Sequence, residues 1–402
     1  MSSQVLVINS GSSSLKYQIV HARTGVAAAS GLIERIGYEQ SRITHRNNSD
    51  STTWTIDAPD HTEAMTHMQD AFASLGPSLT DLDLVAVGHR VVQGGYRFGA
   101  PVLINDSVKT IIDELSGLAP LHNPANLDGI NAAQVAFPDL PHVAVFDTAF
   151  HMTMPTRAAT YALNAEVARQ YRVRRYGFHG TSHSYVSKQA AQFLGQADAD
   201  TNLIVLHLGN GASATAVAGG ASVDTSMGLT PLEGLVMGTR TGDIDPAVIM
   251  YLARTAGMSL DDIDDLFNRR SGMLGLTGHQ DMRDVVAAWR AGNPAAEAGL
   301  ELYTYRLKKY IGAYFAVLGR VDAVVFTAGI GENSPDIRQL TISGLEHLGL
   351  GIDPEKNRED KPGVLDVSAD GVSVRTLVVP TNEEWEIARQ TLRTVQEPSD
   401  EA

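Results

Sequence analysis

Two similar hairpin patterns, about 200 residues apart, constrain the fold of this chain more than any other feature. In the first, an apolar run at 5–8 leads through a turn rich in Gly and Ser to a second run at 17–20. In the other, the run 203–206 leads through a glycine-containing turn to a return strand at 214–218. Short apolar runs bounded by such turns are typical of paired strands. The repeat favours two related domains whose glycine-rich loops face a common cleft, although two unrelated hairpins fit it equally well.

Strand and helix patterns alternate through the rest of the chain. Apolar runs cover 84–87, 143–146 and 323–326, and helical patterns cover 62–74, 260–268 and 300–318. Such alternation predicts an α/β fold. The 402 residues are more than one ordinary core uses, which favours two domains.

Composition excludes several classes of protein. The net charge of −15 disfavours nonspecific nucleic-acid binding, so no nucleic-acid partner is expected. Any site for an anion must then carry local cations or backbone N–H donors. The chain has no cysteine, which excludes disulfides and thiolate metal sites. No apolar run approaches the roughly 18 residues that span a bilayer, and no signal peptide is recognisable, so we expect a cytoplasmic protein without a membrane partner.

Two glycine-containing segments are candidate phosphate loops. The segment NSGSSSLK at 9–16 offers glycine, hydroxyls and a lysine, but it lacks the Walker A spacing, and taken alone it fits an ordinary turn better. Asn9, at the strand end, could orient a metal-bound water. The segment GIGEN at 329–333 follows a strand and precedes a helix, where two glycines permit close approach of a nucleotide.

Two arginines, Arg90 and Arg240, stand beside glycines in loops or at strand ends. An arginine in such surroundings suits bidentate binding of a carboxylate or phosphate, although a structural ion pair explains each one equally well. Arg283 is flanked by acids and is more ambiguous.

His179 and His183 have the spacing of metal ligands on a helix, but Gly180-Thr181-Ser182 between them is a poor helix interior. No HExxH motif is present, so zinc is disfavoured, and an imidazole that donates to a transferring phosphoryl group is the better interpretation. Asp147 and Glu383 follow apolar runs, where a carboxylate can hold Mg²⁺ through water or can simply belong to a turn.

Together these segments resemble the acetokinase family along nearly the whole chain. The resemblance is carried by residues 9–16, 88–92, 120–124, 146–151, 175–183, 207–211, 223–228, 231–234, 239–246, 326–334 and 380–383. NSGSSSLK and RRYGFHGTSH (174–183) are its most specific parts. It implies an α/β fold of two duplicated ribonuclease-H-like domains, as in actin-like ATPases, with a central cleft between them. The domains would be 1–149 with 384–402, and the nucleotide-binding 150–383.

The resemblance also implies a reaction and its partners. The protein would be a homodimer that transfers the γ-phosphoryl group of ATP to acetate with Mg²⁺, or with Mn²⁺ as a second candidate metal. The products would be acetyl phosphate and ADP. A carboxylate is already an adequate nucleophile, so we expect direct in-line displacement without a phosphoenzyme.

Residue by residue, the resemblance implies that Asn9 and Glu383 hold Mg²⁺. Arg90 and Arg240 would bind the carboxylate and the phosphoryl group in flight. Asp147 would position the acceptor or a metal-bound water, and His179 would donate to the transition state. An apolar pocket for the methyl group would be formed by Val92, Leu121, Phe178 and Pro231. ATP would be held by Lys16, Ser12 and Ser14, by His207, Leu208, Gly209, Asn210 and Gly211, by Asp281, Met282 and Arg283, and by Gly329, Ile330, Gly331, Glu332 and Asn333.

The sequence departs from the family pattern beside the acceptor pocket. Gln93 stands where the family usually has His, and Tyr96 stands where Glu often follows the glycines. A kinase for propionate or butyrate is therefore the alternative. A nonenzymatic ATPase module of the actin or chaperone kind is less favoured, since it has no use for two glycine-flanked arginines.

Overall fold

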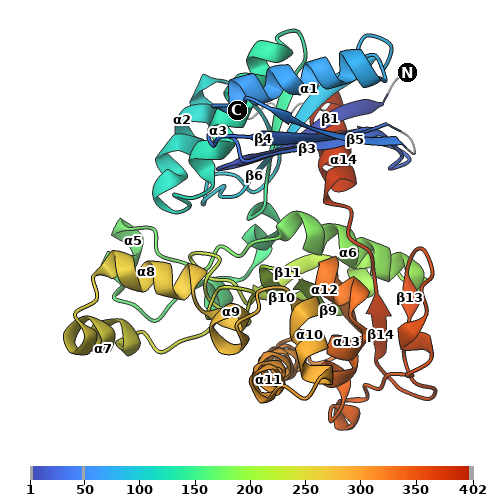
Figure 1. Ribbon diagram of the computed structural model, residues 1–402. Helices are drawn as coiled ribbons and strands as arrows, with labels where there is room; N and C mark the ends of the chain where they lie inside the picture. The colour runs from blue at the N-terminus through green and yellow to red at the C-terminus, as the bar shows by residue number, and fades with distance from the viewer. Residues whose placement is uncertain (1–2, 48–49, 398–402) are drawn as a thin grey trace. The chain divides into compact units, whose positions relative to one another are not determined.

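The computed structural model describes residues 3–47 and 50–397, which form two compact units (Figure 1). The first unit is Met1–Phe150 with Asn382–Ala402, and the second is His151–Thr381. The ends of the expected first domain, residues 1–2 and 398–402, lie outside the described part of the chain. Each unit is built around one β-sheet.

The sheet of the first unit has eight strands in the order β5-β4-β3-β2-β1-β6-β8-β7. The strands are β1 Gln4–Gly11, β2 Ser14–His21, β3 Ala27–Glu34, β4 Ser41–Asn47, β5 Asp50–Ile56, β6 Leu84–Val91, β7 Val102–Leu103 and β8 His142–Phe146. Strands β5 to β1 pair antiparallel, and β1, β6 and β8 pair parallel. The predicted first hairpin is therefore confirmed as β1 and β2.

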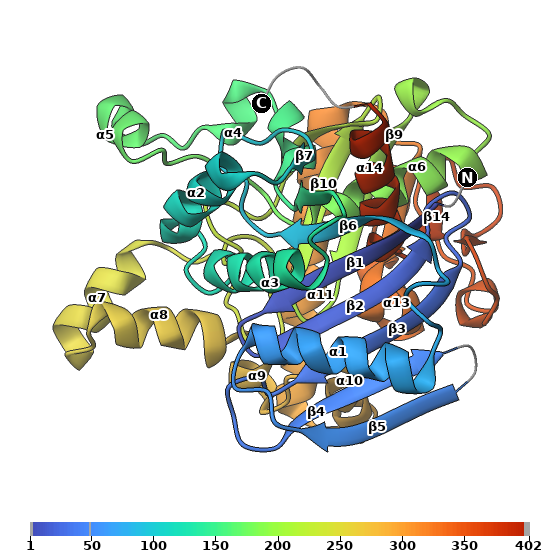
Figure 2. The ribbon, with the colours of Figure 1, turned by 90° about the horizontal axis from the view of Figure 1, so that it is seen from above.

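Helices cover both faces of this sheet because side chains alternate along each strand. Leu6 and Ile8 of β1 belong to the core under α1 (His61–Leu75) and α3 (Asn123–Ala136), which lie across the strands in Figure 2. Val5 and Val7 belong to the core under α14 (Glu383–Gln396), on the opposite face. The last helix of the chain thus completes the first unit.

The sheet of the second unit repeats this plan with six strands, in the order β11-β10-β9-β12-β14-β13. The strands are β9 Asn202–Leu208, β10 Ala212–Ala218, β11 Ala221–Thr225, β12 Ala323–Thr327, β13 Leu365–Asp366 and β14 Arg375–Val378. Strands β11, β10 and β9 pair antiparallel, and β9, β12 and β14 pair parallel. In the first unit, β3, β2 and β1 likewise pair antiparallel, and β1, β6 and β8 pair parallel. The expected duplicated α/β fold is therefore confirmed.

The second unit contains ten α-helices in the described part of the chain. They are α4 Thr156–Ala159, α5 Ala165–Gln170, α6 Gly180–Phe193, α7 Ala247–Ala256, α8 Leu260–Arg269, α9 Gly272–Thr277, α10 Met282–Arg290, α11 Pro294–Leu318, α12 Ala328–Asn333 and α13 Pro335–Ile342. Helix α11 packs on β10, and α6 packs on β9 and β12. No helix in the described part of the chain is long and apolar enough to cross a membrane.

Candidate active site

Three predicted site residues of the first unit lie at the carboxyl ends of its parallel strands. The register pairs Ile8 of β1 with His89 of β6, and Val91 of β6 with Phe146 of β8. Asn9 and Arg90 follow the first pair, and Asp147 follows the second. Because parallel strands end at the same edge of a sheet, the fold itself brings these three together.

Arg90 and Asp147 form a bidentate ion pair. Arg90 Nε donates to both carboxylate oxygens at 3.0 and 3.1 Å, and Arg90 Nη2 donates to Oδ2 at 2.6 Å. The Asp147 side chain is 2% exposed, whereas that of Arg90 is 22% exposed. Burial by itself would lower the pKa of Arg90, but Asp147 and Glu383 raise it well above its usual value. The guanidinium therefore stays charged and keeps one partly open side.

Glu383 is the first residue of α14, and its carboxyl interacts electrostatically with Arg90 and Asp147. Burial raises the pKa of its carboxyl, and Asp147 adds to the shift, while Arg90 opposes it. Two carboxylates beside one guanidinium leave excess negative charge, which suits a divalent cation.

The predicted phosphate loop is the two-residue turn between β1 and β2, Ser12-Ser13. Three carbonyls of this hairpin are bound elsewhere: that of Ser10 by Asn126 Nδ2 at 2.8 Å, that of Gly11 by His61 Nε2 at 2.9 Å, and that of Ser13 by the Ile36 N–H at 3.0 Å. A loop that binds an anion must turn its carbonyls away, so this pattern fits the prediction. Ser12 and Lys16 are exposed and Ser14 is half-buried.

Lys16 has a partner that the sequence interpretation did not foresee. Its ammonium pairs with Glu384, which stands directly after Glu383 on α14. The pair links the phosphate hairpin to the helix that carries a predicted metal ligand. The sequence does not indicate this ion pair, because 368 residues separate Lys16 from Glu384.

Two of the predicted pocket residues belong to the first unit, Val92 and Leu121. Val92 is buried, and its N–H donates to Asn126 Oδ1 at 3.0 Å, so one amide side chain holds both this residue and the phosphate hairpin. Leu121 is 51% exposed. Phe178 is buried and Pro231 is half-buried, both in the second unit. Beside Val92, Gln93 is fully buried, and its Oε1 accepts from the Gly95 N–H at 2.9 Å.

In the second unit, His179 lies in a cluster of imidazoles and hydroxyls. Its ring stacks on that of His207 with centroids 4.2 Å apart, and its Nδ1 lies 2.9 Å from Ser213 Oγ. His207 Nδ1 lies 2.8 Å from Ser182 Oγ. The backbone of His179 has φ 56°, a left-handed conformation that a histidine adopts uncommonly and that is frequent at functional sites.

The segment after His179 begins a helix. Gly180-Thr181-Ser182, a poor helix interior by sequence, forms the first turn of α6, which begins at Gly180 and continues to Phe193. The first turn of a helix needs no earlier hydrogen-bond partners, so poor helix formers are tolerated there. His183 is consequently one turn after His179, and both rings approach Ser213.

Arg240 stands beside His179 and the glycine turn after β9. A Cβ added at Gly211 would lie 3.4 Å from Arg240 Nη1 and 3.6 Å from His179 Nε2, so both groups border the same glycine. Arg240 Nη1 donates to the Pro231 carbonyl at 3.3 Å, and within the described chain Arg240 forms no ion pair with a carboxylate. Burial lowers the pKa of its guanidinium. A half-buried arginine without a carboxylate partner is suited to an external anion.

The loop that carries Arg240 is closed by Asp243. The Asp243 carboxylate accepts from the Gly234 N–H at 2.9 Å and from Tyr310 Oη at 3.0 Å. Arg306 Nη1 lies 3.1 Å from the same carboxylate. Tyr310 and Arg306 both belong to α11, so this helix fixes the base of the loop.

The three predicted ATP segments surround the carboxyl ends of β9 and β12. The turn Gly209-Asn210-Gly211 follows β9, and its Asn210 Oδ1 accepts from Gln280, next to the start of α10, at 3.0 Å. Gly331 packs against the Leu206 carbonyl and Phe326, which sets α12 beside β9. Met282 is buried, while Arg283 pairs with Asp281 and is 90% exposed; this pair lowers the pKa of Asp281 to about 2.

A model of the acetokinase family matches residues 4–389. The chain belongs to the acetokinase family. The acetate kinase of Leifsonia xyli is 58% identical over 98% of this chain and 99% of its own, and that of Streptomyces coelicolor is 54% identical over 98% of each. Two solved structures are similar throughout. A Porphyromonas gingivalis acetate kinase has a TM-score of 0.93 at 40% identity, covering 98% of this chain and 99% of its own. A Francisella tularensis propionate kinase has a TM-score of 0.92 at 42% identity, covering 97% and 99%.

Only two side chains of this acetokinase, Asn9 and Glu383, are predicted to bind a metal ion. No group of three or more His, Asp or Glu side chains with metal-binding spacing occurs within residues 3–47 and 50–397. Asn9 and Glu383 offer oxygen ligands in the same unit, as Mg²⁺ prefers. Mg²⁺ usually keeps several waters and the phosphates of its nucleotide, so two protein oxygens fit it better than they fit zinc.

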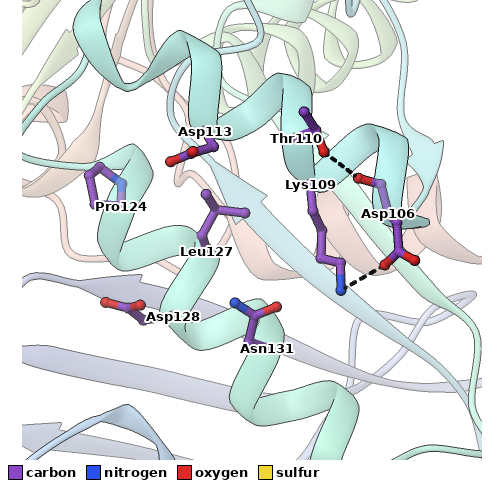
Figure 3. Close-up of a pocket in the computed structure, with 8 residues that line it drawn as sticks. All are labelled: Asp106, Lys109, Thr110, Asp113, Pro124, Leu127, Asp128 and Asn131. Atoms are coloured by element: carbon purple, nitrogen blue, oxygen red, sulfur yellow. Dashed lines mark hydrogen bonds and ion pairs between the residues drawn. The ribbon is translucent and has the colours of Figure 1, made fainter.

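A surface hollow in the first unit of the acetokinase contains none of the predicted site residues. It has a volume of about 500 Å³ and lies between α2 (Asp106–Glu114) and α3, as Figure 3 shows. It is lined by Asp106, Lys109, Thr110, Asp113, Pro124, Leu127, Asp128 and Asn131. Its three carboxylates would repel a nucleotide or a carboxylate, so it is not the substrate site.

Sequence reasoning missed several supporting residues of the acetokinase. Arg338 is 2% exposed, and its Nη1 donates to the carbonyls of Gly331 and Glu332 at 2.9 and 2.7 Å, which fixes the end of α12. Burial lowers the pKa of Arg338 to about 10. Asn126, Asp243 and Glu384 were missed as well. Of these, Asp243 alone lies in a segment that carries the resemblance, 239–246.

Proposed function

We propose that this acetokinase transfers the γ-phosphoryl group of ATP to acetate, giving acetyl phosphate and ADP. The observation that carries the proposal is Arg240. Its half-buried guanidinium has no carboxylate partner in the described chain and stands beside His179 and a glycine turn. An anion is the partner that this arrangement lacks, and both the phosphoryl group and the acceptor acid are anions.

The reaction needs placement and charge rather than covalent help from the protein. Arg240 and His179 would stabilise the equatorial oxygens of the phosphoryl group in transfer. Arg90, oriented by Asp147, would hold the acceptor carboxylate. The glycine turn, the start of α10 and α12 would hold the nucleotide, with Ser12, Ser14 and Lys16 in support.

Asn9 and Glu383 would hold Mg²⁺, which neutralises charge on the phosphates when it is bound. We infer a cytoplasmic location as well, on the sequence grounds given above. Neither assignment is required for the choice of acceptor.

We further infer a homodimer. Helix α7 has the sequence AVIMYLARTA, yet none of its residues is buried, and Tyr251 is 65% exposed. Apolar side chains that a helix leaves unburied are typical of a protein interface, and a second copy of the chain would cover them. A mass near 43 kDa in light scattering, the mass of one chain, would contradict this.

A kinase for a longer acid is the second candidate, because a propionate kinase is among the similar structures and because Gln93 and Tyr96 depart from the family pattern. Trapping the acyl phosphate as its hydroxamate with acetate, propionate and butyrate distinguishes the two. We expect acetate to have the highest kcat/KM, since one methylene in a closed pocket is worth roughly 10- to 200-fold.

The variant Val92→Ala should raise kcat/KM for propionate relative to acetate, because Val92 is buried at the predicted wall of the pocket. Val135→Ala is the matched control, since Val135 is 76% exposed on α3. An unchanged ratio of propionate to acetate in Val92→Ala would remove this residue from the pocket.

A further inference from the structure

One hydroxyl in the second unit connects two imidazoles. Ser213 Oγ lies 2.9 Å from His179 Nδ1 and 2.7 Å from His183 Nε2. Ser213 and His183 are both completely buried. A serine hydroxyl has one proton, so it can donate to only one of the two rings. The tautomers of the two histidines are therefore coupled through Ser213.

The tautomer of His183 decides to which of the two rings Ser213 donates its proton. Burial, with the neighbouring His151 and His207, lowers its pKa well below 6.5, so the ring is neutral near pH 7. Its Nδ1 has no hydrogen-bond partner in the described chain. Buried N–H groups without an acceptor are rarer in proteins than buried acceptors without a donor. The proton of His183 therefore belongs on Nε2, where Ser213 Oγ accepts it.

The proton of Ser213 is then directed to His179 Nδ1, and the proton of a neutral His179 must be on Nε2. That nitrogen borders Gly211 on the same side as Arg240 Nη1. We propose that Ser213 and His183 are positioning residues that hold His179 as an Nε2–H donor toward the phosphoryl group. The role of His179 as a donor to the phosphoryl group rests on the proposed function, whereas the positions of the protons on His179, Ser213 and His183 do not.

Such a relay would give His179 a fixed donor without a positive charge. A donor oriented before the reaction needs no reorganisation in the transition state. Groups that orient a metal-binding side chain typically contribute 10- to 100-fold to activity, and we expect a similar factor for Ser213 and His183. The effect should fall on kcat, because neither Ser213 nor His183 is placed to contact substrate.

The first test is the ¹⁵N NMR spectrum of the wild-type protein labelled at histidine, with the signals assigned by His179→Ala and His183→Ala. We expect both neutral rings to carry the proton on Nε2, with His179 Nδ1 as a hydrogen-bonded acceptor. A proton on Nδ1 of either ring would overturn the proposal. Because the spectrum needs no turnover, it remains informative even if the protein had no kinase activity.

The second test is kinetic. Ser213→Ala and His183→Leu should each lower kcat about 10-fold with little change in KM, and His183→Gln, which retains a donor, should restore much of it. Thr215→Val removes a buried hydroxyl from the same strand, where it pairs with Thr225 rather than with a histidine, and should leave kcat unchanged. Ser213→Ala should have no further effect in the His179→Ala background. An equal loss in that background would show a merely structural role and would overturn the proposal.

Discussion

Replacing Arg240 with alanine should lower kcat/KM for ATP and acetate by roughly two to nearly four orders of magnitude, which corresponds to about 3–5 kcal/mol of transition-state stabilisation. The reason is the setting of the side chain. Its guanidinium is half-buried and desolvated, has no carboxylate partner in the described chain, and borders the same glycine as His179. Removing it would take away a fixed cation that we expect to stabilise the charge of the transferring group.

The same substitution should leave the stability of the fold nearly unchanged, because no buried carboxylate depends on Arg240. Arg320→Ala is the matched control, since Arg320 is an exposed arginine with its own ion-pair partner, Asp322. Steady-state kinetics and chemical denaturation of both variants separate the two effects. Near-normal turnover of Arg240→Ala would show that the guanidinium has no part in the transfer.

Replacing Arg90 with alanine should lower activity by a similar factor, but it should also destabilise the protein. Asp147 is 2% exposed and receives three hydrogen-bond contacts from Arg90. Removing one partner of a buried pair leaves an uncompensated charge and costs about 3–5 kcal/mol of stability. Glu383 would lose the same cation.

The double variant Arg90→Ala with Asp147→Ala separates the two roles of this arginine. Removing both charges should recover much of the stability, because no buried carboxylate is left unpaired at position 147. Activity should stay at the level of Arg90→Ala. A double variant that regained turnover together with stability would mean that Arg90 serves the fold alone.

The repeated hairpins could be predicted from the sequence because strand length, apolar runs and glycine-rich turns are local properties. Asn9, Arg90 and Asp147 could be proposed for the same reason, since each follows the end of an apolar run. Their meeting at one sheet edge follows from the parallel pairing of β1, β6 and β8.

The supporting contacts could not be predicted, because they join residues that are distant in the chain. Lys16 pairs with Glu384, and Asp243 is held by Tyr310 and Arg306 of a helix more than 60 residues later. Nothing in the local sequence marks either pair.

The start of α6 at Gly180 could not be predicted from the local sequence. Helix propensity disfavours Gly180-Thr181-Ser182, but the packing of α6 on β9 and β12 decides where this helix begins. The contacts of His179 and His183 with Ser213 depend on where α6 begins. Helix propensity alone therefore could not predict them.

The most direct test of the account is whether breakdown of ATP by the wild-type protein is coupled to the acid. ADP and acetyl phosphate should be measured together, with and without acetate, in the presence of Mg²⁺. We expect one acetyl phosphate per ADP and almost no ADP without acetate. Release of ADP at the same rate without acetate, or ADP without acetyl phosphate, would contradict it.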